Sequence, residues 1–210
     1  MPTAQEKQKL VIAYRTIPAL SGLDVAVVRT LDVHEVLSFL SGGPLFSTGH
    51  YVENLYVSDC AASNNSKTWT LQFKEDSRFS DGTNLTAEHW YHSIARTIRV
   101  GAGVHFNPKK DLLGADQSTD GYCEGLKLQG NRVELTLTEP NRHFHRLLGK
   151  IEASILPLSG PGITSIDMAS LAGAGPYCIE GYEKKRVILR INPHFPGHKG
   201  RMAFERIDLL

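Results

Sequence analysis

Regular alternation of polar and apolar residues in two separate segments constrains the fold of this chain more than any other feature. Every second residue is apolar in TWTLQFK (68–74) and again in NRVELTLTEP (131–140), where Pro140 ends the pattern. The apolar positions are Trp69, Leu71, Phe73, Val133, Leu135 and Leu137. Because neighbouring side chains of a strand point to opposite sides, this spacing predicts antiparallel strands with one buried face.

The stretch between these two strands predicts a turn followed by a helix. In FSDGTNLTAEHW (79–90), Asp81-Gly82 suits a tight turn, in which glycine accepts a positive φ and aspartate bonds the backbone downstream. Thr86 is placed to cap a helix that begins at Ala87. The apolar stripe of this helix is Trp90, Ile94 and Ile98, and Gly101 and Gly103 end it. We interpret the stretch as a corner that joins sheet to helix.

The N-terminal part of the chain predicts a strand, a loop and a helix. KLVIAY (9–14) is a short apolar run, typical of a strand that is buried on both faces. Apolar residues then recur at helical spacing over 25–40, and the helix is expected to stop at Gly42-Gly43-Pro44. The apolar positions of this helix are Val28, Leu31, Val36, Leu37 and Leu40.

The remaining segments predict a loop, a second helix and a group of strands. Residues 104–125 are rich in Gly, Asp, Asn and Ser, which favours a long surface loop. NRHFHRLLGKI (141–151) predicts a helix with Phe144, Leu147 and Leu148 on one side. GPYCIEGYE (175–183) and RVILRINPHF (186–195) predict a strand pair, and FERIDLL (204–210) predicts a further strand at an edge.

Charge and hydropathy exclude several classes of protein. The formal net charge is +1, so no strong field attracts nucleic acid or an anionic membrane, and no direct nucleic-acid partner is expected. No segment approaches the roughly 20 apolar residues that span a bilayer. The first residues, MPTAQEKQKLVIAY, contain no apolar leader. A cytoplasmic protein and an extracytoplasmic protein without its signal peptide both fit these observations.

Three motifs follow one another in a recognisable order. WTLQFKEDSRFSDGTNLTAEHWYHSI (69–94) contains an F-x-D-G turn and an L-T-A segment, and ELTLTEPNRHFHRLL (134–148) places a proline after a strand. GAGPYCIEGYEKKRVILRINPHF (173–195) ends a strand in Asn-Pro and an aromatic residue. Together with KLVIAY and Leu23-Asp24, they resemble family 5 of the extracytoplasmic solute-binding proteins, the oligopeptide, dipeptide and nickel class of ABC transporters. The chain departs from the family pattern at His89, where an acid is usual, and at Ala174, where threonine is usual.

The resemblance implies an α/β fold, the first lobe of a type II periplasmic-binding-protein-like fold with an inserted β-rich (α+β) subdomain. Residues 1–45 and 161–210 would form the lobe core, and residues 46–160 the inserted subdomain. Members of the family are much longer, so the second lobe is expected to be absent from this chain.

Residue types that carry chemistry are present, but their spacing predicts no reaction. The histidine pairs His89/His92, His143/His145 and His194/His198 are not joined by further ligands at the spacing of a metal site. Cys60, Cys123 and Cys178 leave open one disulfide with a spare thiol, and none lies beside an activating cation. We expect no enzyme activity, no metal and no cofactor.

Binding is the function that the pattern favours. In open α/β folds ligands lie beyond the carboxyl ends of strands, where loops converge. The predicted ligand-binding residues are Arg15, Thr16, Ile17, Ser41, Gly42, Gly43, Ala174 and Tyr177. The same residues suit plain turn chemistry equally well.

By resemblance, the chain would be part of the substrate-binding component of an ABC transporter, capturing a peptide or another small solute. Its partners would be that ligand, the missing second lobe and the membrane subunits of the transporter, and its location would be periplasmic or otherwise extracytoplasmic. One alternative is the solute-binding-like, ligand-sensing domain of an intracellular transcription regulator. A metal-dependent enzyme is the third hypothesis.

Overall fold

The computed structural model describes residues 9–14, 23–27, 30–47, 50–101, 104–160, 162, 166, 171–183, 186–197 and 204–210. Within these residues the strands form two four-stranded sheets, ordered β1-β10-β9-β8 and β4-β5-β7-β6, and one two-stranded sheet, β2-β3. The elements are β1 (Lys9–Ile12), α1 (Leu31–Leu40), β2 (Leu45–Ser47), β3 (Val52–Asn54), β4 (Val57–Ser63), β5 (Thr68–Phe73), α2 (Ala87–Val100), α3 (Pro108–Asp111), β6 (Leu126–Gln129), β7 (Arg132–Thr136), the 3-10 helices η2 (Phe144–Gly149) and η3 (Ile151–Ala153), β8 (Tyr177–Glu183), β9 (Arg186–Ile191) and β10 (Arg206–Leu209).

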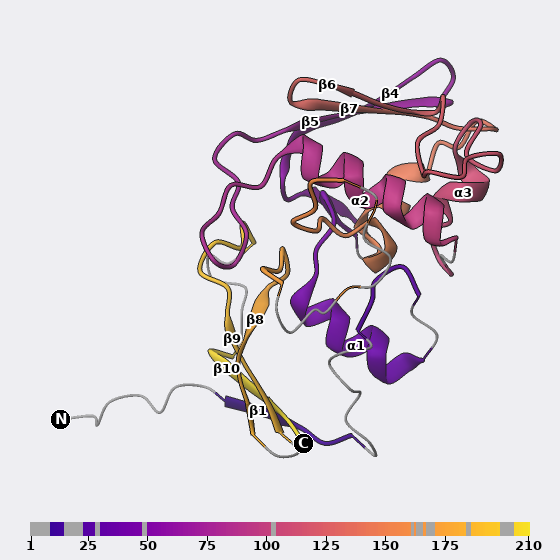
Figure 1. Ribbon diagram of the computed structural model, residues 1–210. Coiled ribbons are helices and arrows are strands. Elements are labelled where there is room, and N and C mark those ends of the chain that lie inside the picture. The colour runs from indigo at the N-terminus through magenta and orange to yellow at the C-terminus, as the bar shows by residue number, and fades with distance from the viewer. Residues whose placement is uncertain are drawn as a thin grey trace.

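The antiparallel sheet β4-β5-β7-β6 confirms the alternation of the sequence. Along β5, Trp69, Leu71 and Phe73 are buried while their neighbours are half-exposed, and β7 buries Val133 and Leu135. This sheet lies at the top of Figure 1, and α2 packs along its inner face. We call the sheet and α2 the α2 unit.

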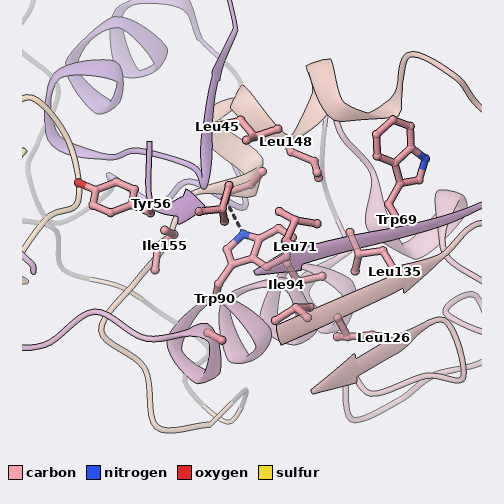
Figure 2. Packing of buried hydrophobic residues seen from close by; sticks show 14 of the residues in the cluster. Leu45, Tyr56, Trp69, Leu71, Trp90, Ile94, Leu126, Leu135, Leu148 and Ile155 are labelled. Atoms are coloured by element: carbon pink, nitrogen blue, oxygen red, sulfur yellow. Dashed lines mark hydrogen bonds between the residues drawn. The ribbon is translucent and has the colours of Figure 1, made fainter. Parts of the chain in front are cut away.

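The core of the α2 unit centres on Trp90, as Figure 2 shows. Trp90 is fully buried against Phe73, with ring centroids 5.6 Å apart, and its Nε1–H donates to the carbonyl oxygen of Ala153 at 2.9 Å. Ile94 and Ile98 continue the buried stripe. The predicted helix is therefore confirmed, including its end at Gly101, which adopts a left-handed conformation with φ 80°.

The turn before α2 also forms as predicted. Gly82 has φ 87°, and Asp81 Oδ1 accepts hydrogen bonds from Thr83 N–H at 2.9 Å and from Thr83 Oγ1 at 2.7 Å. These bonds lower the pKa of the Asp81 carboxyl. At the helix start, His89 Nδ1 accepts the Thr86 N–H at 3.1 Å, so the histidine supplies the second half of a capping box.

The second sheet joins the two ends of the described chain. Strand β1 pairs in parallel with β10, which pairs in antiparallel fashion with β9, and β9 with β8. Helix α1 covers one face, and its Leu37 and Leu40 share a core with Leu189 and Ile207 (Figure 1). We call this sheet and α1 the α1 unit.

Two predictions for these strands were wrong. Strand β10 is not an edge strand, because it lies hydrogen-bonded between β1 and β9. Strand β1 is not buried on both faces: its exposure alternates, and Val11 is half exposed. Beside it, the buried Asp208 binds Lys9 Nζ at 2.7 Å and Arg206 Nε at 2.6 Å, and these partners, Arg206 first, lower its pKa.

Three further segments differ from the sequence-based expectation. Helix α1 begins at Leu31 and not at residue 25, because 25–27 form a turn; Leu31 is therefore exposed on the first turn. The segment 141–151 forms no α-helix: a turn at 142–143 leads into the 3-10 helix η2, and η3 begins at Ile151. The loop 104–125 is more firmly held than expected, because Phe106, Leu112 and Ala115 are buried. Val28 lies outside the described residues.

The mixed architecture is consistent with the α/β class. The boundaries 1–45, 46–160 and 161–210 stay a prediction, although the α2 unit falls within the middle range and the strands of the α1 unit fall within the outer two. In the part of the chain that is described, no helix has both the length and the apolarity needed to cross a membrane.

Candidate functional site

Three exposed apolar side chains lie near the beginning of α1. Val27 is 37% exposed, Leu31 86% and Val104 70%, although they come from two distant segments. The segments meet where the His34 ring contacts the His105 ring edge-on, with centroids 5.9 Å apart. We call Val27, Leu31, His34, Val104 and His105 the α1 face. Contiguous exposed apolar patches mark binding sites, so we treat these neighbouring residues as a candidate binding surface.

A buried ion pair fixes one side of the α1 face. The Asp24 carboxylate accepts two hydrogen bonds from the Arg96 guanidinium, one of them 2.9 Å long, and Arg96 is fully buried on α2. Asp24 Oδ1 also accepts the Ala26 N–H at 3.0 Å, and its backbone oxygen accepts the Val27 N–H. The turn that carries Val27 is therefore anchored to the α2 unit.

A buried carboxylate fixes the other side. Glu152 Oε1, on η3, accepts the backbone N–H groups of Val104 at 3.1 Å and His105 at 2.9 Å. Glu152 is buried, and its second oxygen, Oε2, has no hydrogen-bond partner. Because two strong acceptor bonds hold adjacent amides, the backbone at Val104 is fixed while its side chain faces outward.

The predicted ligand-binding residues lie elsewhere. Arg15, Thr16 and Ile17 lie outside the described residues. Ser41, Gly42 and Gly43 follow the last turn of α1, at its other end from the α1 face, and line one cavity of about 310 Å³.

The two remaining predicted residues do not line that cavity. Ala174 is buried, and its carbonyl oxygen lies only 2.5 Å from where a side chain on Gly42 would begin. Tyr177 is buried, donates its hydroxyl to the Phe204 carbonyl at 2.8 Å, and lines a separate cavity of about 260 Å³. Three of the five described residues thus line one cavity, Ala174 contacts one of these three, and the ligand-binding set stays a prediction.

The two histidines of α2 occupy structural positions. His89 caps α2, and His92 Nδ1 lies 3.0 Å from the Tyr122 hydroxyl, so the pair that was weighed as metal ligands is divided between two roles. Among the described residues no group of three or more His, Cys, Asp or Glu is arranged to hold a metal ion. All three cysteines are free thiols, and burial raises the pKa of Cys60 to about 11. A raised pKa disfavours the reactive thiolate.

Sequence reasoning missed the α1 face. Leu31 was assigned to the buried stripe of a longer helix, and Val104 to a polar loop. The sequence signal that could have revealed this face is the tendency of Leu23-Asp24 to form a turn. Because of that turn, α1 begins only at Leu31, and Leu31 is exposed. Glu152 belongs to no motif, and only the tertiary structure places it under the loop at Val104.

Comparison with known proteins gives a consistent picture. Residues 51–210 match the model of a family described as bacterial extracellular solute-binding proteins, family 5, middle. The probable D,D-dipeptide-binding periplasmic protein DdpA of Escherichia coli is 29% identical over 170 residues, covering 75% of this chain and 30% of that protein. The periplasmic oligopeptide-binding protein OppA of Salmonella typhimurium is 26% identical over 144 residues, which is 61% of this chain and 26% of OppA.

Solved structures agree on the fold. The crystal structure of Haemophilus influenzae OppA in complex with the peptide RPPGFSPFR superposes with a TM-score of 0.79 at 17% identity, over 99% of this chain and 42% of that one. The unliganded open form of the murein tripeptide-binding protein MppA gives 0.77 at 17% identity, over 98% of this chain and 41% of that one. The chain spans 26% to 30% of the length of the curated relatives it matches.

Proposed function

Because this chain belongs to family 5 of the bacterial extracellular solute-binding proteins, we propose that it supplies one side of a peptide-binding cleft in the substrate-binding component of an ABC transporter. The named relatives are a probable D,D-dipeptide-binding protein and an oligopeptide-binding protein, both described as periplasmic. The observation that carries the proposal is the α1 face, where Leu31 and Val104 are exposed beside a backbone fixed by Glu152.

The chemistry of the α1 face suits a peptide better than a small ion. Leu31 and Val104 offer apolar contact to side chains of many shapes, which is worth about 25 cal/mol for each Å² buried. The anchors at Asp24 and Glu152 hold the two loops in place before the ligand arrives. Fixed loops reduce the entropy that binding must overcome.

In a protein of the relatives' length, the remaining residues would supply the opposite side of the cleft. A ligand that contacts both sides favours the closed arrangement, so binding shifts a hinge equilibrium. We place the protein outside the cytoplasm, delivering its ligand to the membrane subunits of the transporter. Ser41, Gly42, Gly43, Ala174 and Tyr177 remain proposed contributors to ligand binding. The relatives named above give no support to a transcription-regulator domain.

Calorimetric titration of the 210-residue chain with dipeptides and oligopeptides tests the proposal. We expect weak binding, since only one side of the cleft is present, and we expect Leu31→Asp and Val104→Asp to abolish it. Tyr51→Asp is the matched control, because Tyr51 is also exposed but lies beside Val52 and Cys60, away from the residues of the α1 face. Tight binding by this chain, or binding that survives both substitutions, would contradict the proposal.

A further inference from the structure

A cavity at the C-terminal end of α1 has the composition of a small-molecule site. Its volume is about 310 Å³, which lies at the lower end of the range of ligand pockets. The apolar part of its wall includes Phe46, Leu55, Ile151 and Phe195. On α1, Ser38 in the cavity wall lies four residues after His34 of the α1 face, which is about 6 Å along the helix axis.

Glycine backbone makes part of the wall rigid. A side chain on Gly43 would begin 2.4 Å from the Leu148 carbonyl oxygen, and one on Gly149 would begin 2.8 Å from the Ser47 nitrogen. The Gly42 carbonyl also accepts the Ile155 N–H at 2.9 Å. These close backbone contacts leave little freedom for the wall to collapse, so the cavity is part of the fold.

One polar group in the wall lacks a partner. Ser154 lines the cavity, is buried, and its Oγ makes no hydrogen bond. A buried hydroxyl without a partner costs free energy, but the Ser154 Oγ is itself shielded from solvent, so we assign it no contact with a ligand. By contrast, the Ser41 hydroxyl in the same wall already donates to the Leu37 carbonyl at 2.6 Å.

Two opposite charges complete the wall. Glu53, on β3, and Lys150, between η2 and η3, both line the cavity and are half-buried. A carboxylate contributes acceptors and an ammonium contributes donors, so together they suit a ligand that carries both an ammonium and a carboxylate group. The apolar wall would then receive the rest of that ligand.

We propose that this cavity binds a free α-amino acid with an aromatic or branched apolar side chain. The ligand's carboxylate pairs with Lys150, its ammonium pairs with Glu53, and its side chain packs against Phe46, Leu55 and Phe195. The cavity shares Ser41, Gly42 and Gly43 with the residues proposed above as contributors to ligand binding, but binding of an amino acid here does not require that a peptide contacts the α1 face.

Titration of the ¹⁵N-labelled 210-residue chain with L-phenylalanine tests the proposal. We expect a dissociation constant of about 1 mM or lower, which follows from the binding free energy that small ligands reach per non-hydrogen atom. 3-Phenylpropionate and 2-phenylethylamine, which each lack one charge, should bind about tenfold more weakly. Absence of binding by L-phenylalanine, or equal binding of all three compounds, would overturn the proposal.

Two substitutions locate the site. Ser38 is exposed on α1 and lines the cavity, so Ser38→Trp should block it and abolish binding. Lys150→Gln should weaken binding about tenfold by removing the partner of the carboxylate. Ser58→Trp and Lys110→Gln are the matched controls, because both residues are exposed and neither lines the cavity.

Circular dichroism and thermal unfolding of each variant show whether it is folded. Binding by a folded Ser38→Trp variant equal to that of the unchanged chain would place the ligand elsewhere and refute the site. If Ser38→Trp does not fold, the affinities of Lys150→Gln and Lys110→Gln for L-phenylalanine are compared instead. Equal affinity of these two variants would refute the proposed site as well.

Discussion

The α2 unit and the α1 unit are built from similar parts but depend on the chain in different ways. The sheet of the α2 unit uses strands from one continuous stretch, residues 57–136. The sheet of the α1 unit pairs Lys9–Ile12 with Arg206–Leu209, from opposite ends of the described chain. Contacts so distant in sequence carry a larger loop-closure cost. We infer that the α2 unit is the stable platform, and that the α1 face depends on links to it.

The largest effect is expected from Trp90→Ala in the platform. The substitution removes a fully buried indole and its hydrogen bond to Ala153, and should lower the free energy of unfolding by about 4 kcal/mol. Leu189→Ala in the α1 unit is the comparison and should cost about 2–3 kcal/mol. Urea unfolding measures both. A greater loss for Leu189→Ala would reverse the proposed order of the two units.

The next largest effect is expected from loss of the Asp24–Arg96 ion pair, which links the turn at Val27 to α2. Asp24→Ala leaves the Arg96 guanidinium buried without its carboxylate and should cost about 3 kcal/mol. It should also release the turn at Val27, so hydrogen exchange at Ala26 and Val27 should rise while exchange in β5 stays slow. Asp59→Ala, at an exposed position on β4, is the control. Unchanged exchange at Val27 would show that the ion pair does not hold the turn.

A smaller effect is expected at the contact between the end of α1 and the segment before β8. A side chain on Gly175 would begin 2.4 Å from the Leu40 carbonyl carbon and 2.5 Å from the Ser41 nitrogen. Gly175→Ala should therefore cost about 2 kcal/mol, measured by thermal unfolding. Gly160→Ala meets nothing within 4 Å and should leave the stability unchanged. Equal stability of the two variants would show that the backbone around Gly175 accommodates a methyl group without loss of stability.

The smallest effect is expected from protonation of His89 at the start of α2, which makes the stability of the fold depend on pH. Burial lowers the pKa of His89 below its ordinary value of about 6.5, and its Nδ1 must be unprotonated to accept the Thr86 N–H. The unfolded chain then binds the proton more readily, so stability is full above about pH 6.5 and falls as the pH drops below that value. His89→Gln should flatten this dependence between pH 7 and pH 5. A slope identical to that of the unchanged chain would exclude His89 as its source.

The same contrast explains what could be predicted from the sequence. Strands β5 and β7, the Asp81-Gly82 turn and α2 were predicted correctly, because alternation, turn residues and helix caps act over a few neighbours. The central position of β10 was not, because its partner β1 lies at the other end of the described chain. The position of Leu31 was missed because the turn at Asp24 delays the start of α1. Glu152 reaches Val104 through tertiary contacts that no local pattern encodes.

Mapping amide chemical shifts of the ¹⁵N-labelled chain during titration with an excess of oligopeptide tests the central claim most directly. The account predicts that the largest shifts occur at Val27, Leu31, Val104 and His105, and that the strands of the sheet β4-β5-β7-β6 remain unaffected. Shifts confined to that sheet, or none at the α1 face under saturating peptide, would contradict it.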